Sequence, residues 1–102
     1  MNIEKIKSLY IELEKYLKQY GNNSILPSYK IVKSTVELLS SNENDEVKKQ
    51  IAVESYKKLF PGKGALSDFF VWDNDYETRK KINEPFEKTH NMLWELLKDE
   101  IH

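Results

Sequence analysis

The sequence predicts an all-α protein: a small antiparallel bundle of about four helices, with an irregular glycine- and aromatic-rich connector before a last helix kinked by proline. Apolar residues recur at three- and four-residue steps through most of the chain, as on one face of a helix. The exception is the segment 59–73, LFPGKGALSDFFVWD, which holds two of the three glycines and three of the four phenylalanines. With 102 residues, we expect a single helical domain covering residues 1–102.

The first predicted helix covers residues 2–20. Lysine and glutamate fill one side, and the apolar stripe on the other side consists of Ile3, Ile6, Tyr10, Leu13, Leu17 and Tyr20. Gly21 follows this stripe. We expect it to end the helix in the left-handed conformation that glycine adopts without penalty.

The second helix is predicted from about Pro27 to Ser40, because proline is tolerated in the first turn of a helix. Its inner face should consist of Tyr29, Val32, Val36 and Leu39, with Ile25 and Leu26 packing at its entry. The third helix is predicted from about Asp45 to Phe60, with Asn44 as its cap. Its buried stripe should be Val47, Ile51, Ser55 and Leu59, with Ala52 and Tyr56.

The last helix is predicted from about Asn74 to the end of the chain, with Asn74 or Asp75 as its cap. Its apolar positions, in rough register, are Tyr76, Ile82, Phe86, Leu93, Trp94, Leu97 and Ile101. Pro85 interrupts this pattern and would either kink the helix or divide it. We favour one kinked helix, because no glycine or polar loop accompanies the proline.

The connector is too apolar for an ordinary loop. Pro61, Gly62 and Gly64 predict tight turns, and we expect Ser67 or Asp68 to bond to nearby backbone amides. One interpretation is that its aromatic residues are buried and close one end of the bundle. The other is that some of them, notably Phe69, Phe70 and Trp72, remain exposed as an apolar patch for a partner. The two interpretations are compatible.

Composition excludes several classes of function. Sixteen basic and 17 acidic residues leave a net charge of −1, so we expect no nucleic-acid partner. No apolar segment approaches the ~18 residues that span a membrane, so we expect no membrane partner. Cysteine is absent, which fits a cytoplasmic protein. The glycine pair lacks the spacing of a phosphate-binding loop, and neither histidine has the spacing of a metal ligand, so we expect no cofactor and no metal ion.

Part of the chain resembles a known group of proteins. The residues concerned are Leu59, Phe60, Gly62, Gly64, Leu66, Ser67, Asp68 and Phe69, then Asn83 and Glu84, and the later run Leu93, Trp94, Glu95, Leu96 and Leu97. They resemble small helical bacterial proteins of unknown function that carry an LFGGMGSLNDL-type segment before a helix containing LWEL. Pro61, Lys63, Ala65 and Pro85 depart from that pattern. Such proteins are often immunity or accessory proteins in toxin gene clusters, so the resemblance implies a binding role and no catalytic residue.

These observations together predict a non-enzymatic protein-binding module, and in its most specific form a cytoplasmic immunity protein that neutralises a cognate bacterial toxin. The expected partner-binding residues are Asp68, Phe69, Trp72, Asp73 and Asp75. The acidic groups would complement a basic partner. We expect a monomer or a weak homodimer. Two alternatives stay open: a small-ligand-binding protein or minor enzyme with its site among the tyrosines and the glycine turn, and a structural subunit whose patch is buried by self-association.

Overall fold

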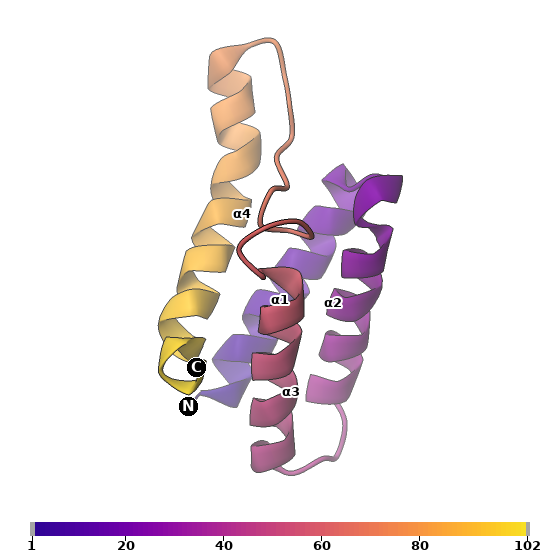
Figure 1. Ribbon diagram of the computed structural model, residues 1–102, viewed down its shortest axis with the longest axis vertical. Coiled ribbons are helices and arrows are strands. Elements are labelled where there is room, and N and C mark those ends of the chain that lie inside the picture. The colour runs from indigo at the N-terminus through magenta and orange to yellow at the C-terminus, as the bar shows by residue number, and fades with distance from the viewer. Residues whose placement is uncertain (1, 102) are drawn as a thin grey trace.

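The computed structural model describes residues 2–101, and within them the chain forms four α-helices that run alternately up and down (Figure 1). They are α1 (Ile3–Tyr20), α2 (Leu26–Leu39), α3 (Asp45–Leu59) and α4 (Tyr76–Leu97). Short 3₁₀ turns, η1 (Asn23–Ile25) and η2 (Lys98–Glu100), precede α2 and follow α4. The prediction of a small all-α bundle is therefore confirmed.

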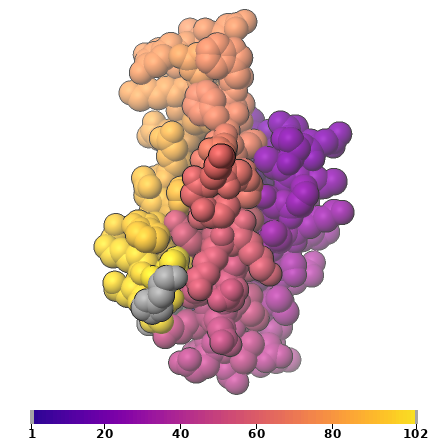
Figure 2. Space-filling model, in the orientation of Figure 1, coloured from indigo at the N-terminus to yellow at the C-terminus, as the bar shows by residue number. Residues whose placement is uncertain are grey.

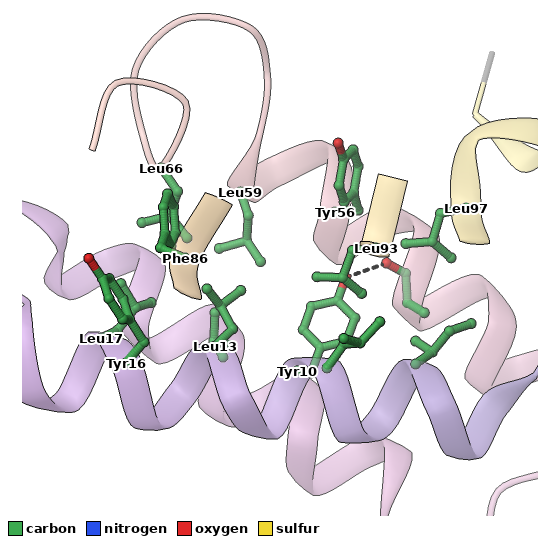
Figure 3. Packing of buried hydrophobic residues seen from close by; sticks show 14 of the residues in the cluster. Tyr10, Leu13, Tyr16, Leu17, Tyr56, Leu59, Leu66, Phe86, Leu93 and Leu97 are labelled. Atoms are coloured by element: carbon green, nitrogen blue, oxygen red, sulfur yellow. Dashed lines mark hydrogen bonds between the residues drawn. The ribbon is translucent and has the colours of Figure 1, made fainter. Parts of the chain in front are cut away.

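Helix α1 is the centre of the bundle. It packs against all three other helices, while α2 packs against α1 and α3, and α4 meets the bundle mainly through α1. The side chains between these helices form one core, part of which is drawn in Figure 3. Its most completely buried members are Ile6, Tyr10, Leu13, Val32, Leu39, Ala52, Leu59, Leu66, Leu93 and Leu97.

Helix α1 buries Ile6, Tyr10, Leu13 and Leu17 of the predicted stripe, together with Leu9 and Tyr16, which the stripe did not include. Ile3 and Tyr20, near its two ends, are half-buried. The expected conformation of Gly21 is wrong, because its backbone is extended, with φ −71° and ψ 161°. A Cβ atom at this position would collide with the carbonyl oxygen of Leu17 and the side chain of Ile25. Glycine is therefore needed here because the turn passes very close to the end of α1.

Helix α2 begins with Pro27 in its first turn, as predicted, and buries Ser28, Val32, Thr35 and Leu39. The Thr35 hydroxyl lies 2.7 Å from the Ser55 hydroxyl of α3 and 2.7 Å from the Ile31 carbonyl oxygen, which satisfies this buried polar pair. The expectation that Leu26 packs at the entry is wrong, since Leu26 is 43% exposed. Ile25 alone fills that position, because the η1 turn directs it toward α1.

Helix α3 is capped by Asn44, whose side-chain oxygen accepts a hydrogen bond of 2.9 Å from the Val47 amide. Its buried residues are Ala52, Val53, Ser55, Tyr56 and Leu59, whereas Val47 and Ile51 are only half-buried. The buried face is wider than the predicted stripe because α3 packs against both α1 and α2.

Helix α4 continues through Pro85 without a break, in agreement with the prediction of one last helix. Its buried residues begin at Asn83 and continue with Phe86, Leu93 and Leu97. The expected burial of Tyr76 and Trp94 is wrong, because they are 61% and 42% exposed. The first turns of α4 project beyond the other helices (Figure 1), so Tyr76 has no facing helix to pack against.

Removal of the hydroxyl group from two core tyrosines is expected to change the free energy of unfolding in opposite directions. The Tyr16 hydroxyl is buried without a hydrogen-bond partner among the described residues, and its burial raises the pKa of Tyr16 to about 12. The Tyr10 hydroxyl donates a 2.8 Å hydrogen bond to the Ala52 carbonyl oxygen. Since an unpaired buried hydroxyl costs free energy, Tyr16→Phe should raise the free energy of unfolding by about 1 kcal/mol, whereas Tyr10→Phe should lower it by about 1–2 kcal/mol. Urea unfolding measures both, and equal effects of the two variants would contradict the prediction.

Candidate protein-binding site

The connector between α3 and α4 begins with a glycine turn. Gly62 and Gly64 have φ angles of +94° and +78°, in the region that glycine occupies at no steric cost. The Gly62 amide donates a 3.0 Å hydrogen bond to the Ser67 hydroxyl, and the Gly64 amide donates a 2.7 Å bond to the Asp68 carboxylate. Ser67 and Asp68 therefore both bond to local amides. Pro61 lies at the start of this turn, where α3 has ended.

The connector is anchored to the core by its next apolar residues. Leu66 is 1% exposed, and its amide donates a 2.9 Å hydrogen bond to the Leu59 carbonyl oxygen. The ring of Phe69 packs edge-on against Tyr16 and Phe86, with ring centres 6.2 and 5.5 Å apart. Phe69 is thus half-buried and directed toward the core.

Asn83 of α4 fixes the following part of the connector. Its side-chain oxygen accepts a 2.9 Å hydrogen bond from the Val71 amide, and its side-chain nitrogen donates bonds of 2.8 and 2.9 Å to the carbonyl oxygens of Val71 and Arg79. Asn83 is 4% exposed, so these bonds are shielded from water. The side chain acts like a neighbouring strand, pairing with both backbone groups of Val71.

The residues on either side of Val71 carry exposed aromatic rings. Phe70 is 53% exposed, Trp72 is 68% exposed, and Tyr76 at the start of α4 is 61% exposed. The guanidinium carbon of Arg79 lies 4.3 Å from the centre of the Trp72 ring and 5.4 Å from that of Tyr76. We call Phe70, Trp72, Tyr76 and Arg79 the aromatic arm. Figure 2 shows the part of the chain that carries it standing above the rest of the molecule.

An open cavity of about 530 Å³ lies along the aromatic arm. Phe70 and Tyr76 supply its apolar wall, and the remaining lining residues are Arg79, Lys80, Asn83, Glu84 and Glu87. This combination of aromatic walls with charged rims is typical of surfaces that bind another molecule.

The predicted acidic residues each have a local structural partner. Asp73 accepts a 2.8 Å hydrogen bond from the Asp75 amide, and Asp75 caps α4 by accepting bonds from the Thr78 amide and hydroxyl at 2.9 and 2.7 Å. The bonds from Thr78, with a smaller effect of Arg79, hold the pKa of Asp75 below its usual range. Only one oxygen of each carboxylate is engaged in this way among residues 2–101. Asp73 and Asp75 therefore also present negative charge at the end of the molecule that carries the aromatic arm, which we call the tip.

The structure separates the predicted site residues into two groups. Trp72 belongs to the aromatic arm, and Asp73 and Asp75 lie next to it in the chain, while Asp68 lies at the glycine turn and Phe69 faces the core. Sequence reasoning assigned Tyr76 to the core and did not identify Arg79. Arg79 could have been noticed in the sequence, because it is the single arginine among 16 basic residues and arginine stacks on aromatic rings more readily than lysine.

A second cluster surrounds His90. Its ring stacks on Phe60 with centres 3.8 Å apart, and its Nε2 lies 2.9 Å from the Tyr56 hydroxyl oxygen. A nearby cavity of about 280 Å³ is lined by residues that include Ser67, His90 and Asn91. Tyr56 belongs to this cluster, but Tyr10 and Tyr16 are core residues elsewhere and Tyr76 lies on the aromatic arm, so the tyrosines do not gather at one site.

His90 predicts a pH dependence of stability. Burial lowers the pKa of His90 below its ordinary value of 6.5, so the unfolded chain takes up its proton at a higher pH than the folded chain. The free energy of unfolding should therefore fall as the pH decreases from 6.5 toward the lower folded pKa. His90→Gln should remove this slope, as measured by urea unfolding at a series of pH values. An unchanged slope in the variant would contradict the assignment.

Three further observations concern the class of protein. No helix within residues 2–101 has the length and apolar character needed to cross a membrane. In the same residues no three histidine, aspartate or glutamate side chains are grouped as a metal site would require. Comparison of the chain with models of protein families, with curated proteins and with solved structures found no match.

Proposed function

We propose that this protein is a non-enzymatic protein-binding module and that the aromatic arm is its binding surface. The observation that supports this most directly is the exposed stack in which Arg79 lies against Trp72 and Tyr76. Tryptophan, tyrosine and arginine are the residue types that supply most of the binding energy at protein interfaces.

The aromatic arm is ordered before it meets a partner. Asn83 fixes the backbone at Val71, between Phe70 and Trp72, and the Trp72 indole nitrogen donates a 3.3 Å hydrogen bond to the Asn74 side chain. Arg79 is held in turn by a 3.3 Å bond to the Asp73 carbonyl oxygen. Since side chains that are already ordered lose less entropy on binding, more of the contact energy appears as affinity.

The partner that we propose is a basic protein. Asp73 and Asp75 lie beside Trp72, Glu77 stands in the first turn of α4, and all three add negative charge to the tip. These three carboxylates would raise the association rate of a partner whose basic groups reach the end of the arm, whereas Arg79 and Lys80, which line the neighbouring cavity, would favour acidic groups there. In its most specific form, the protein is a cytoplasmic immunity protein of bacterial origin, and the partner is its cognate toxin. Asp68 would extend the acidic surface toward the glycine turn.

The proposal is tested by affinity capture from the native host. The wild-type chain, a Trp72→Ala, Tyr76→Ala variant and a Trp94→Ala control are compared; Trp94 is a partly exposed tryptophan away from the aromatic arm. The arm variant should lose the captured partner, and with the purified partner its affinity should fall by about 30-fold or more. The control should bind as the wild type does. Equal capture by all three proteins would exclude the aromatic arm as the binding surface.

The charge and the identity of the partner need separate measurements. Asp73→Lys should slow association and reduce its dependence on salt while the dissociation rate changes little. An unchanged association rate would remove the electrostatic part of the proposal. A toxin gene beside the gene for this chain, encoding the captured protein, would support the immunity role, whereas capture of an unrelated protein would leave only the binding module.

A further inference from the structure

The first half of α4, which we call the half-helix, extends beyond the other three helices and is contacted by the connector rather than by another helix. At 1.5 Å per residue the 22 residues of α4 extend about 33 Å, against about 22 Å for the 15 residues of α3. The excess projects at one end of the bundle, and the molecule measures 45 Å along its longest axis but 25 and 23 Å along the others. In Figure 2 this end of α4 rises above the other helices, and the face drawn there is open to solvent.

One ridge of this half-helix is exposed along its whole length. Its members are Tyr76, Lys80, Glu84 and Lys88, spaced four residues apart, so that they follow one another along the helix surface. Tyr76, Lys80 and Glu84 also line the 530 Å³ cavity together with Phe70. Among the described residues, Lys80, Glu84 and Lys88 take part in none of the ion pairs, which form elsewhere on the surface.

We propose that this ridge is the contact surface for a second copy of the chain, in a two-fold dimer of antiparallel α4 half-helices. A two-fold axis that passes through the ridge between Lys80 and Glu84 sets Lys80 of one copy opposite Glu84 of the other, and Tyr76 opposite Lys88. Because the axis exchanges the copies, both contacts occur twice, as in any isologous interface. In this antiparallel arrangement each basic residue of one ridge therefore faces an acidic or an aromatic residue of the other ridge. Ridges of four-residue spacing pack against each other in the commonest class of helix crossing.

Charge and size favour a second copy and a weak association. A net charge of −1 means that two copies do not repel each other strongly. At 53% and 61% exposure, Phe70 and Tyr76 offer roughly 200 Å² of apolar surface per copy. An interface with so small an apolar part and a charged remainder belongs to the small, weak class. We therefore expect a dissociation constant of about 10–100 µM. Tyr76 and Phe70 also belong to the aromatic arm, so a foreign partner and the second copy would compete for them.

Sedimentation velocity of the full chain tests the dimer. Between about 1 µM and about 1 mM in low salt, the average mass should rise from that of one chain toward that of two. Lys80→Glu should weaken the association about tenfold or more, because it places two carboxylates opposite each other at both symmetric contacts, and Glu84→Lys should do the same with two ammonium groups. The double variant Lys80→Glu, Glu84→Lys restores both opposite pairs and should associate like the wild type. Lys33→Glu on α2, an exposed charge outside the ridge, is the matched control and should change nothing.

Three outcomes would overturn the proposal. They are a wild type that stays monomeric up to about 1 mM, a dimer that resists both single reversals, and a double variant that associates no better than the single ones. Circular dichroism of each variant verifies that it is folded. The charge variants retain Trp72, Tyr76 and Arg79, on which the test of the proposed function depends. A charge variant that no longer dimerises but still captures the partner therefore separates the two proposals.

Discussion

Asn83→Asp is expected to lower the free energy of unfolding by about 3–5 kcal/mol, although the two side chains have nearly the same shape. The Asn83 nitrogen donates to the carbonyl oxygens of Val71 and Arg79 in a site that is 4% exposed. A carboxylate cannot donate these bonds and places a negative charge against two carbonyl oxygens. Urea unfolding measures the loss, and hydrogen exchange at the Val71 amide should show earlier opening of the connector.

The matched control for this experiment is Asn91→Asp. Asn91 lies two turns further along α4 and is exposed, so the same chemical change there should alter the free energy of unfolding by no more than about 0.5 kcal/mol. Equal stability of the two variants would show that the Asn83 hydrogen bonds contribute little to folding.

Leu66→Ala is expected to destabilise the fold by about 3 kcal/mol, since it removes a fully buried side chain from the point where the connector meets the core. Leu66 is 1% exposed, and Figure 3 shows it beside Phe86 of α4. The loss should appear in urea unfolding and should be accompanied by faster hydrogen exchange at Phe69 and Val71.

Phe70→Ala is the informative comparison within the same segment. Phe70 is 53% exposed, so its removal should change stability by no more than about 0.5 kcal/mol while weakening binding at the aromatic arm. This pair of variants separates the part of the connector that supports the fold from the part that is exposed for binding. A Leu66→Ala variant as stable as the Phe70→Ala variant would contradict the anchoring role.

The helices were predictable because their signals are local. The apolar stripe of α1 repeats over the whole helix, and the caps Asn44 and Asp75 immediately precede the helices that they begin. One last helix was predicted in spite of Pro85, and α4 does continue through this proline. In each case the determining residues lie within about one or two turns of the structure that they specify.

The candidate site was only partly predictable because its geometry depends on contacts between distant residues. Asn83 is hydrogen-bonded to Val71, 12 residues earlier, and no sequence spacing predicts such a pair. Tyr76 fits the apolar spacing of α4, but α4 begins beyond the end of the bundle. No other helix covers Tyr76 there, and it stays exposed. The sequence predicts a left-handed cap at Gly21 because the approach of Ile25 is not visible in it.

The two tryptophans lie in settings that give them separate spectroscopic uses. Trp72 stands 68% exposed against the Arg79 guanidinium, whereas Trp94 is stacked on Tyr56, whose hydroxyl contacts His90. With Trp94 replaced by phenylalanine, intrinsic fluorescence would come from the tip alone and would follow the occupation of the aromatic arm. With Trp72 replaced, the remaining emission would follow the cluster around His90. The chain thus carries one built-in optical probe for the aromatic arm and another for the cluster around His90.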